Sequence, residues 1–331
     1  MRATNSGSRG HVSGSPRERL IFCALLVILT MFLTACGGNS SSSTASSTTP
    51  LHLYVGVEAV PTGGETPGCS TGELLTFTLP ISSASTPTFT APGISNVGSL
   101  AANGKGNIAV SRGDFCQFVG GAEIDIYQTA LGNSSIPLTH DLSITSGQPV
   151  FSATGDLFVP SKVHAVQFKA PLRRGITPSQ LIPPQPNTNF NAMGLDLNNN
   201  LIIAGCYPDG CNLLALAPPY SGTPVATALM HFGYVGIAIN ETQLFALAPA
   251  SGIDVYNLPI VASSQPIFSI TKGLNLSLLT AQGIALDADD NLYVVSSDSI
   301  TVYNPPYSAA SIPSFTLPLG VEAATSIAVG K

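Results

Sequence analysis

Cysteine is the residue type in this sequence whose spacing points most directly to chemistry. Cys206 and Cys211 enclose the turn sequence Tyr-Pro-Asp-Gly, so their thiols can meet across a hairpin. Cys69 and Cys116 lie at equivalent places in two successive repeats of the chain. An even number of cysteines favours disulfides when a domain lies in an oxidising compartment. We therefore predict the pairs Cys206–Cys211 and Cys69–Cys116. The competing interpretation is a zinc ion held by all four cysteines, although the sequence contains a single Cys-x4-Cys pair.

Motifs that would indicate catalysis are absent from the sequence. It contains no nucleophile elbow, phosphate loop, dinucleotide fingerprint or two-histidine zinc helix. Asp287-Ala-Asp-Asp290 lacks the glycine and the distant glutamate of a calcium-binding EF-hand loop, so we interpret it as a turn. We expect structural roles for the isolated histidines, which are His52, His140, His164 and His231. The sequence thus predicts no catalytic residue, no metal ligand and no cofactor.

The side chains best suited to binding lie in three long segments between predicted strands, at 56–72, 111–122 and 204–212. We expect these segments to lie on one face around a central channel, where a rigid scaffold positions binding residues. The alternative is that Arg112 and Asp114 form a solvated ion pair and that the aromatic residues pack beneath the loops. The candidate binding residues are Arg112, Asp114, Phe115, Tyr207 and Asp209.

A repeat supplies the scaffold for these segments. A polar residue, then Leu or Ile, then two apolar or small residues recur at intervals of 43 to 55 residues, with copies that begin at His52, Asn107, Asp156, Asn200, Gln243 and Asn291. Strands such as Ile253-Asp-Val-Tyr256 follow, and their period of two predicts half-buried strands. The first copy lacks the short strand that precedes the others. Ser326-Ile-Ala-Val329, at the other end of the sequence, can supply it.

Six such repeats predict an all-β fold, a six-bladed β-propeller over residues 51–331. The ring would be closed by pairing the C-terminal strand with the N-terminal blade, which removes exposed sheet edges. The phrase Gly283-Ile-Ala-Leu-Asp, followed by Asn291-Leu-Tyr-Val294, resembles the NHL-repeat propellers. That resemblance implies the fold and says little about function. A β-helix or a sandwich is the alternative, but neither explains the complementary ends.

The first 36 residues have the pattern of an export signal. A leader with four arginines precedes an apolar run at 20–33, which is shorter than the about 20 residues that a membrane-spanning helix needs. The ending Leu33-Thr34-Ala35-Cys36 resembles the lipobox of bacterial lipoproteins, which implies a signal peptide at 1–35 and a lipid on Cys36. An ordinary signal peptide or an uncleaved anchor is the alternative. Residues 36–50 read as the lipidated cysteine and a Ser/Thr-rich flexible tether.

The net charge of the chain limits the classes of partner that it can bind. After Cys36 the chain has 8 Lys and Arg against 17 Asp and Glu, a net charge of −9 with no basic run, which excludes nucleic acid as a partner. We expect a lipoprotein of the cell envelope, held through the lipid on Cys36. Gly37 favours the outer over the inner membrane, since an aspartate there signals inner-membrane retention in some bacteria.

Two functional classes remain at this stage. The first is a non-enzymatic module that binds an envelope protein or glycan. The second is a divalent-metal-dependent hydrolase or lyase resembling the six-bladed lactonases, which needs carboxylates at the channel mouth. Asp196 and Asp287 are the candidates by position, and both are expected to begin turns. We therefore favour the binding module.

Overall fold

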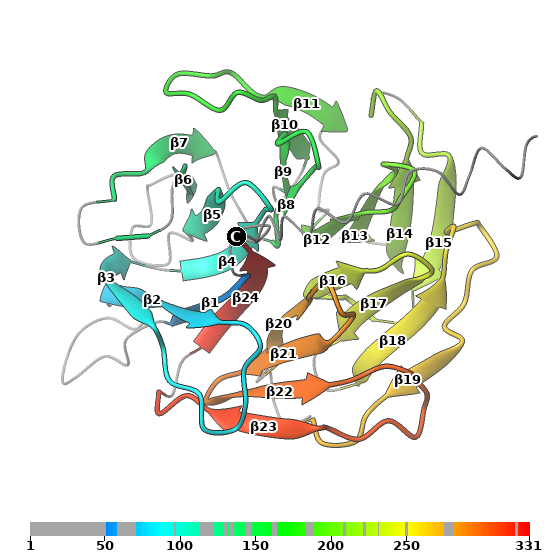
Figure 1. Cartoon of the computed structure of the whole chain (residues 1–331). Coiled ribbons are helices and arrows are strands. Elements are labelled where there is room, and N and C mark those ends of the chain that lie inside the picture. The colour runs from blue at the N-terminus through cyan, green and yellow to red at the C-terminus, as the bar shows by residue number, and fades with distance from the viewer. Residues whose placement is uncertain are drawn as a thin grey trace, which may run out of the picture. The chain divides into compact units, whose positions relative to one another are not determined.

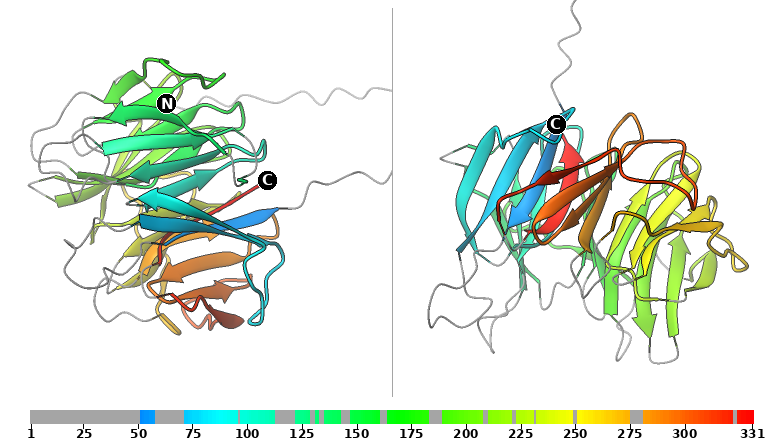
Figure 2. Two further views of the ribbon diagram at one scale, coloured as in Figure 1. Left: turned by 90° about the vertical axis from the view of Figure 1, so that its left-hand side faces the viewer. Right: turned by 90° about the horizontal axis from the view of Figure 1, so that it is seen from below.

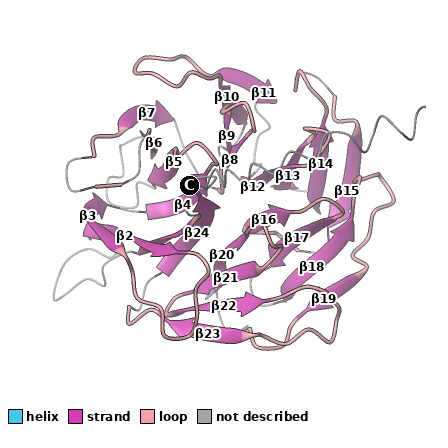
Figure 3. Cartoon of the chain, in the orientation of Figure 1, coloured by secondary structure: helices cyan, strands magenta, loops and turns pink. Residues whose placement is uncertain are grey.

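The computed structural model describes residues 51–57, 71–95, 97–112, 122–128, 131–132, 135–142, 147–160, 164–182, 189–207, 210–220, 223–230, 232–248, 251–274, 281–321 and 324–331. The regular elements in these ranges are β-strands (Figure 3). Within them, no helix has the length and apolar character needed to cross a membrane. The predicted signal peptide at 1–35 and the predicted tether at 36–50, with Cys36, lie outside the described residues.

The strands form six antiparallel four-stranded sheets, each of which is one blade of a six-bladed β-propeller (Figure 1). Blade 1 consists of β24 (Ala324–Gly330), β1 (His52–Val57), β2 (Thr71–Thr78) and β3 (Phe89–Ser95). Blade 2 consists of β4 (Val97–Ala102), β5 (Ile108–Arg112), β6 (Ala122–Tyr127) and β7 (Leu138–Leu142). Blade 3 consists of β8 (Val150–Phe151), β9 (Leu157–Pro160), β10 (Ala165–Phe168) and β11 (Ser179–Ile182).

The second half of the ring repeats this order. Blade 4 consists of β12 (Asn189–Leu195), β13 (Leu201–Tyr207), β14 (Gly210–Leu216) and β15 (Ala226–Met230). Blade 5 consists of β16 (Gly236–Ile239), β17 (Gln243–Ala248), β18 (Gly252–Asn257) and β19 (Phe268–Ile270). Blade 6 consists of β20 (Ala281–Leu286), β21 (Leu292–Ser296), β22 (Ser299–Tyr303) and β23 (Phe315–Pro318).

The two ends of the chain complete blade 1, as the sequence predicted. β24 is the inner strand of this blade and pairs antiparallel with β1, with Leu53 opposite Val329 and Val55 opposite Ile327 (Figure 1). Without this pair, both strands would present unpaired backbone groups as open edges. The prediction of a six-bladed, all-β propeller closed by its C-terminal strand is therefore confirmed.

The prediction that the alternating strands are half-buried is wrong. Along β18, Ile253 and Val255 are fully buried, and Asp254 between them is only 6% exposed. Both faces are covered because each blade packs against a neighbour on either side. Six apolar clusters result, one between each pair of adjacent blades around the ring. A polar residue in such a strand is therefore buried and needs a partner.

The connections between the third and fourth strands contain a second repeat. Five of them begin with a cis prolyl bond at the same place, before Pro80, Pro171, Pro219, Pro259 and Pro306, and blade 2 has Ala130 there instead. The next residue inserts into the apolar cluster shared with the preceding blade. We call these six the plug residues, and they are Ile81, Leu131, Leu172, Tyr220, Ile260 and Tyr307.

Antiparallel pairing gives the ring two different sides. The turns between first and second strands and the connections between third and fourth strands lie at one edge of every blade, which we call the turn side. The hairpins between second and third strands and the blade-to-blade connections lie at the opposite edge, which we call the loop side. In the right-hand view of Figure 2 the turn side is uppermost, and the end of β24 lies there.

Candidate functional site

Two of the five predicted binding residues are described by the structure, and both end strands on the loop side. Arg112 is the last residue of β5, and Tyr207 is the last residue of β13. Strand pairing extends further than the sequence predicted, because Tyr207 lies opposite Gly210 across the β13–β14 hairpin. Asp114, Phe115 and Asp209 lie outside the described residues.

Arg112 forms ion pairs with carboxylates of the neighbouring strand β6. Its guanidinium pairs with Glu123, and Arg112 Nε lies 2.8 Å from Asp125 Oδ2. The Asp125 side chain is only 6% exposed, whereas those of Arg112 and Glu123 are 25% and 36% exposed. A buried carboxylate needs both a cation and hydrogen bonds. The side chain of Arg112 therefore stabilises blade 2, in addition to any contact it makes with a ligand.

Asp125 and Asp254 occupy equivalent positions in blades 2 and 5, and each accepts a hydrogen bond from a hydroxyl of the fourth strand. Thr139 Oγ1 donates to Asp125 Oδ1 at 2.6 Å, and Ser269 Oγ donates to Asp254 Oδ1 at 2.6 Å. In blade 5 the place of the arginine is taken by Tyr234, whose hydroxyl donates to Asp254 Oδ2 at 2.7 Å. Burial is the main cause of the raised pKa of Tyr234, so its hydroxyl stays protonated and donates.

A disulfide joins Cys206 and Cys211 with a Cα–Cα distance of 3.9 Å, which confirms one of the two predicted pairs. The two residues face each other across the β13–β14 hairpin. The bond packs against the blade connection that leads to β16, since a Cβ on Gly233 would lie 3.1 Å from Cys206 Sγ. Cys69 and Cys116 lie outside the described residues. The disulfide therefore closes the β13–β14 hairpin of blade 4 beside the connection that leads to blade 5.

Gln148 connects the inner edges of three blades. It precedes β8 in blade 3, and its backbone N–H donates to Asn191 O at 2.9 Å while its carbonyl accepts from Met193 N–H at 3.1 Å, both in blade 4. Its side-chain amide reaches blade 5, where Oε1 accepts from Ile237 N–H at 2.8 Å and Nε2 donates to Ile237 O at 3.1 Å. Because its backbone lies against the inner strand of blade 4, this side chain joins blade 3 to blade 5 at the channel edge.

Other inner strands are joined in the same region. Ser99 Oγ, in blade 2, donates to Gly147 O of blade 3 at 2.6 Å. Thr325 Oγ1, in blade 1, donates to Val97 O of blade 2 at 2.7 Å. We call Ser99, Gln148 and Thr325 the hub residues. Together they satisfy backbone groups on the channel edge of blades 2 to 5, which no fifth strand pairs.

Glycine allows the inner strands to approach one another closely at the hub. A Cβ on Gly236 would lie 2.9 Å from Ile284 Cγ2 and 3.2 Å from Gln148 Oε1. A Cβ on Gly147 would lie 2.0 Å from the carbonyl oxygen of Asn191. Side chains at these two positions would push neighbouring strands apart, so glycine is required there for packing.

The two acidic residues nearest the channel by sequence position are used in turns, as predicted. Asp196 Oδ1 accepts from the backbone N–H groups of Asn198 and Asn200 at 2.9 and 2.8 Å. Asp287 Oδ1 makes the same pair of bonds with Asp289 and Asn291. In the part of the chain that the structure describes, no three His, Cys, Asp or Glu side chains gather as a metal site would require.

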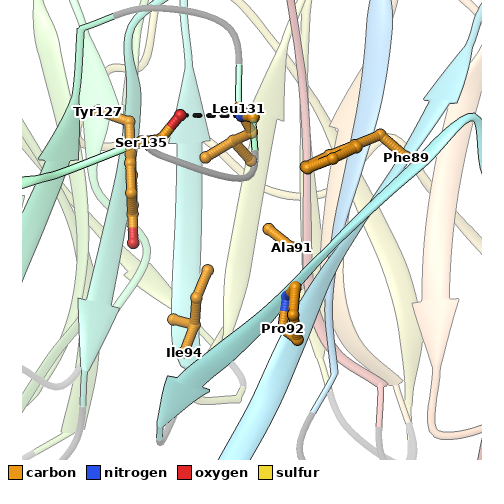
Figure 4. A pocket seen from close by; sticks show the side chains of 8 residues that line it. Phe89, Ala91, Pro92, Ile94, Tyr127, Leu131 and Ser135 are labelled. Carbon is orange, nitrogen blue, oxygen red and sulfur yellow. Dashed lines mark hydrogen bonds between the residues drawn. The ribbon is translucent and has the colours of Figure 1, made fainter.

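A pocket of about 250 Å³ lies between blades 1 and 2, away from the hub (Figure 4). Apolar side chains of β3 and the plug residue Leu131 line it, together with Tyr127. Burial, reinforced by the charge of Asp125, raises the pKa of Tyr127 to about 12. The pocket lies beside the one third-to-fourth connection without the proline turn, where packing against blade 1 is less complete.

Three of the four predicted structural histidines can be placed. His52 is the first residue of β1, and its ring centroid lies 6.0 Å from that of Tyr54. His140 is 8% exposed, and its ring centroid lies 5.0 Å from that of Phe168. Burial lowers the pKa of His164, which favours its neutral form. These observations agree with structural roles. His231 lies outside the described residues.

No protein-family model matches the chain, and no curated protein sequence is detectably similar to it. Solved structures do share the fold. A protein from Lactobacillus plantarum is 14% identical over 81% of this chain and 82% of its own, with a TM-score of 0.56. A gluconolactonase from Xanthomonas campestris is 13% identical over 82% and 89%, with a TM-score of 0.51. Regucalcin from Agrobacterium tumefaciens, a calcium-binding protein, is 9% identical over 70% and 77%, with a TM-score of 0.51. The chain is thus similar to these six-bladed propellers in fold.

Proposed function

We propose that this protein is a lipid-anchored propeller of the bacterial cell envelope that binds a partner protein or glycan on its loop side, without catalysing a reaction. The observation that carries the proposal is the hub. The polar atoms of Gln148 bond to backbone groups of Asn191, Met193 and Ile237 at the channel edge of blades 4 and 5. A small substrate that bound at this edge would have to displace these bonds, whereas a large partner can contact the loop side without doing so.

The lipid anchor is supported by the sequence. The arginine-containing leader, the short apolar run, the box Leu33-Thr34-Ala35-Cys36 and the Ser/Thr-rich segment that follows all agree with a lipoprotein. Several acyl chains at about 0.8 kcal/mol per buried CH₂ would hold the protein stably to a membrane. The spacing of the repeats agrees with a relationship to the NHL-repeat propellers, and Gly37 favours the outer membrane.

The second candidate is a divalent-metal-dependent hydrolase or lyase with its site at the channel mouth. It is favoured by the fold shared with the Xanthomonas gluconolactonase and with the calcium-binding regucalcin. The chain would need carboxylate ligands other than Asp196 and Asp287, whose oxygens already accept backbone hydrogen bonds. This requirement makes the binding module the preferred function.

Photo-crosslinking in living bacteria tests the binding site directly. We would replace Tyr207 with a photoreactive phenylalanine derivative in the full chain and identify adducts by mass spectrometry. The matched control carries the same group at Ile267, an exposed position on the turn side. A discrete adduct at 207 and none at 267 is expected. Equal labelling at both positions, or none at 207, would contradict a loop-side partner.

Two further measurements separate the remaining parts of the proposal. Metabolic labelling with an alkyne fatty acid should mark the wild-type protein and leave Cys36→Ser unmarked. Calorimetric titration with calcium or manganese should show no stoichiometric binding to the purified protein. A one-to-one ion accompanied by lactone hydrolysis would replace the binding module with the enzyme.

A further inference from the structure

We propose that β15, the outer strand of blade 4, pairs antiparallel with the β15 of a second copy of the chain. The inference goes beyond the proposed loop-side function, because it concerns the rim of the ring and a different partner. Three observations carry it, which are the lack of protection along this sheet edge, the exposed side chains of the strand, and the symmetry of its sequence.

Each blade ends in an outer strand with a free backbone edge, and β15 is the outer strand of blade 4 (Figure 1). An open edge is a template for pairing with another chain, so proteins protect such edges with proline, charged residues, bulges or short strands. Five of the six outer strands have a protection of this kind. β3 contains Pro92, β7 contains Asp141, and β23 ends in Pro318. β11 and β19 have only four and three residues.

β15 has none of these protections. It consists of five residues, Ala-Thr-Ala-Leu-Met, without proline or charge. It pairs with β14 from Ala226 to Met230 without a shift of register, whereas register shifts interrupt the pairing of β3 and β11. Among the six outer strands, β15 alone is regular, uncharged and at least this long. Its edge is therefore the one that another strand can extend.

The side chains on one face of β15 are exposed. Val225, just before the strand, and Leu229 are each 65% exposed, and Thr227 between them is exposed as well. We call these three residues the edge stripe. On the other face, Ala228 and Met230 belong to the apolar cluster between blades 4 and 5. The edge stripe thus lies on the strand with the open edge, and its residue types suit a strand that is covered when it pairs.

The edge stripe is complementary to itself. An antiparallel pair of identical strands has a two-fold axis, so each contact between the two copies occurs twice. An axis at Thr227 places this residue opposite its own copy and Val225 of each chain opposite Leu229 of the other. Hydroxyl then meets hydroxyl and aliphatic meets aliphatic, which are favourable cross-strand pairs. No charged residue lies between Thr223 and Met230, so no like charges meet, and a second copy fits this edge.

The size of the contact predicts a reversible dimer. The five residues of β15 are far fewer than the about 20–30 residues a side of a stable interface. The two copies should therefore associate and separate rather than form a permanent assembly. A covalent bond that traps the pair is the appropriate measurement.

Oxidative cross-linking in intact bacteria can trap this dimer. We would introduce Thr227→Cys into the full chain, oxidise with copper phenanthroline and detect covalent dimers on non-reducing gels. Ile312→Cys, at a 68% exposed position in blade 6, is the matched control. We expect a dimer that reductant reverses for Thr227→Cys and none for Ile312→Cys. Val225→Cys and Leu229→Cys chains, produced together with different tags, should cross-link to each other more than either does to itself.

A charge on the edge provides a second test. Leu229→Lys, added to Thr227→Cys, should abolish the dimer, whereas Val261→Lys, at an exposed position of blade 5, should leave it. Circular dichroism and maleimide labelling would establish that each variant is folded and that its thiol is accessible.

An accessible thiol in Thr227→Cys that forms no dimer overturns the inference. Equal cross-linking of Ile312→Cys, a dimer that survives Leu229→Lys, or an adduct with a different protein in place of the second copy does the same. None of these outcomes affects the loop-side site, which the photo-crosslink at Tyr207 tests separately.

Discussion

Gln148 binds Ile237 through both polar atoms of its side-chain amide, as one peptide group binds another in a sheet. Oε1 accepts from Ile237 N–H at 2.8 Å, and Nε2 donates to Ile237 O at 3.1 Å. The contact joins blade 3 to blade 5 at the channel edge. Blade 3 has a two-residue inner strand, β8, which provides little backbone of its own at the centre. The side chain of Gln148 therefore makes hydrogen bonds that the backbone of a longer inner strand would make.

Replacing Gln148 with alanine should lower the free energy of unfolding by about 1–3 kcal/mol, because two hydrogen bonds are lost and the backbone groups of Ile237 are left without them. The side chain in Gln148→Asn is one methylene too short to reach both groups, so this variant should lose nearly as much free energy of unfolding. Urea unfolding followed by circular dichroism measures the change. Gln265→Ala, at an exposed position, is the control and should have no measurable effect. Equal stability of Gln148→Ala and wild type would show that the contact is dispensable.

Arg112→Gln should destabilise the protein by about 3 kcal/mol, because it leaves the buried carboxylate of Asp125 without its cation. Arg174→Gln removes the same charge at an exposed position and should be nearly neutral. Thermal unfolding compares the two variants. If Arg112→Gln is as stable as wild type and instead abolishes the photo-crosslink at position 207, then Arg112 acts in binding and its ion pairs are incidental.

The fold could be predicted because its information is repeated. Six copies of one apolar phrase, and the leading strand at Ser326 that the first copy lacks, specify six blades and their closure. The burial of Asp125 and Asp254 could not be predicted from the strands alone, since alternation looks the same whether one face or both are covered. A signal of this burial lies in the fourth strand of each blade, where Thr139 and Ser269 place hydroxyls opposite the two carboxylates.

The site was harder to predict than the fold. Arg112 was predicted as a binding residue, but its partners Glu123 and Asp125 lie on the next strand. The register that places them beside Arg112 could not be predicted from the sequence. Gln148 was not among the predicted site residues. Alignment of the repeats could have found it, because other blades have Gly236 and Gly283 at the equivalent inner position and a long amide there has to reach a neighbour.

Removing the Cys206–Cys211 disulfide should cost little, since the loop it closes is short. A sequence separation of 5 residues corresponds to a loop-closure contribution of about 2 kcal/mol in the chain-entropy account. We expect Cys206→Ser/Cys211→Ser to fold and to unfold at lower urea concentration. Because Cys69–Cys116 is the second predicted pair, reductant should destabilise the double variant as well as the wild type, and mass spectrometry of alkylated peptides should find Cys69 joined to Cys116. A double variant whose stability reductant leaves unchanged would contradict the second pair.

Alkaline pH should unfold the propeller together with the ionisation of its buried tyrosines. Burial raises the pKa of Tyr54 from 10.0 to about 12, and burial with the charge of Asp125 does the same for Tyr127. The folded state therefore holds these protons more tightly than the unfolded chain does. The resulting stability is complete below pH 10 and is lost as the pH rises through 12, at up to about 1.4 kcal/mol per pH unit for each tyrosine.

Phenolate absorbance and far-ultraviolet circular dichroism, recorded on the same samples, measure this linkage. We expect the two signals to change together above pH 10, and the pH dependence of unfolding to become shallower in Tyr127→Phe because one linked proton is removed. Tyr307, half-buried at the turn side, also has a pKa raised mainly by burial, so it should titrate with the unfolding transition as well. Phenolate formation near pH 10 with unchanged circular dichroism would mean that water reaches these hydroxyls in the folded ring, and that the clusters between blades are looser than their burial indicates.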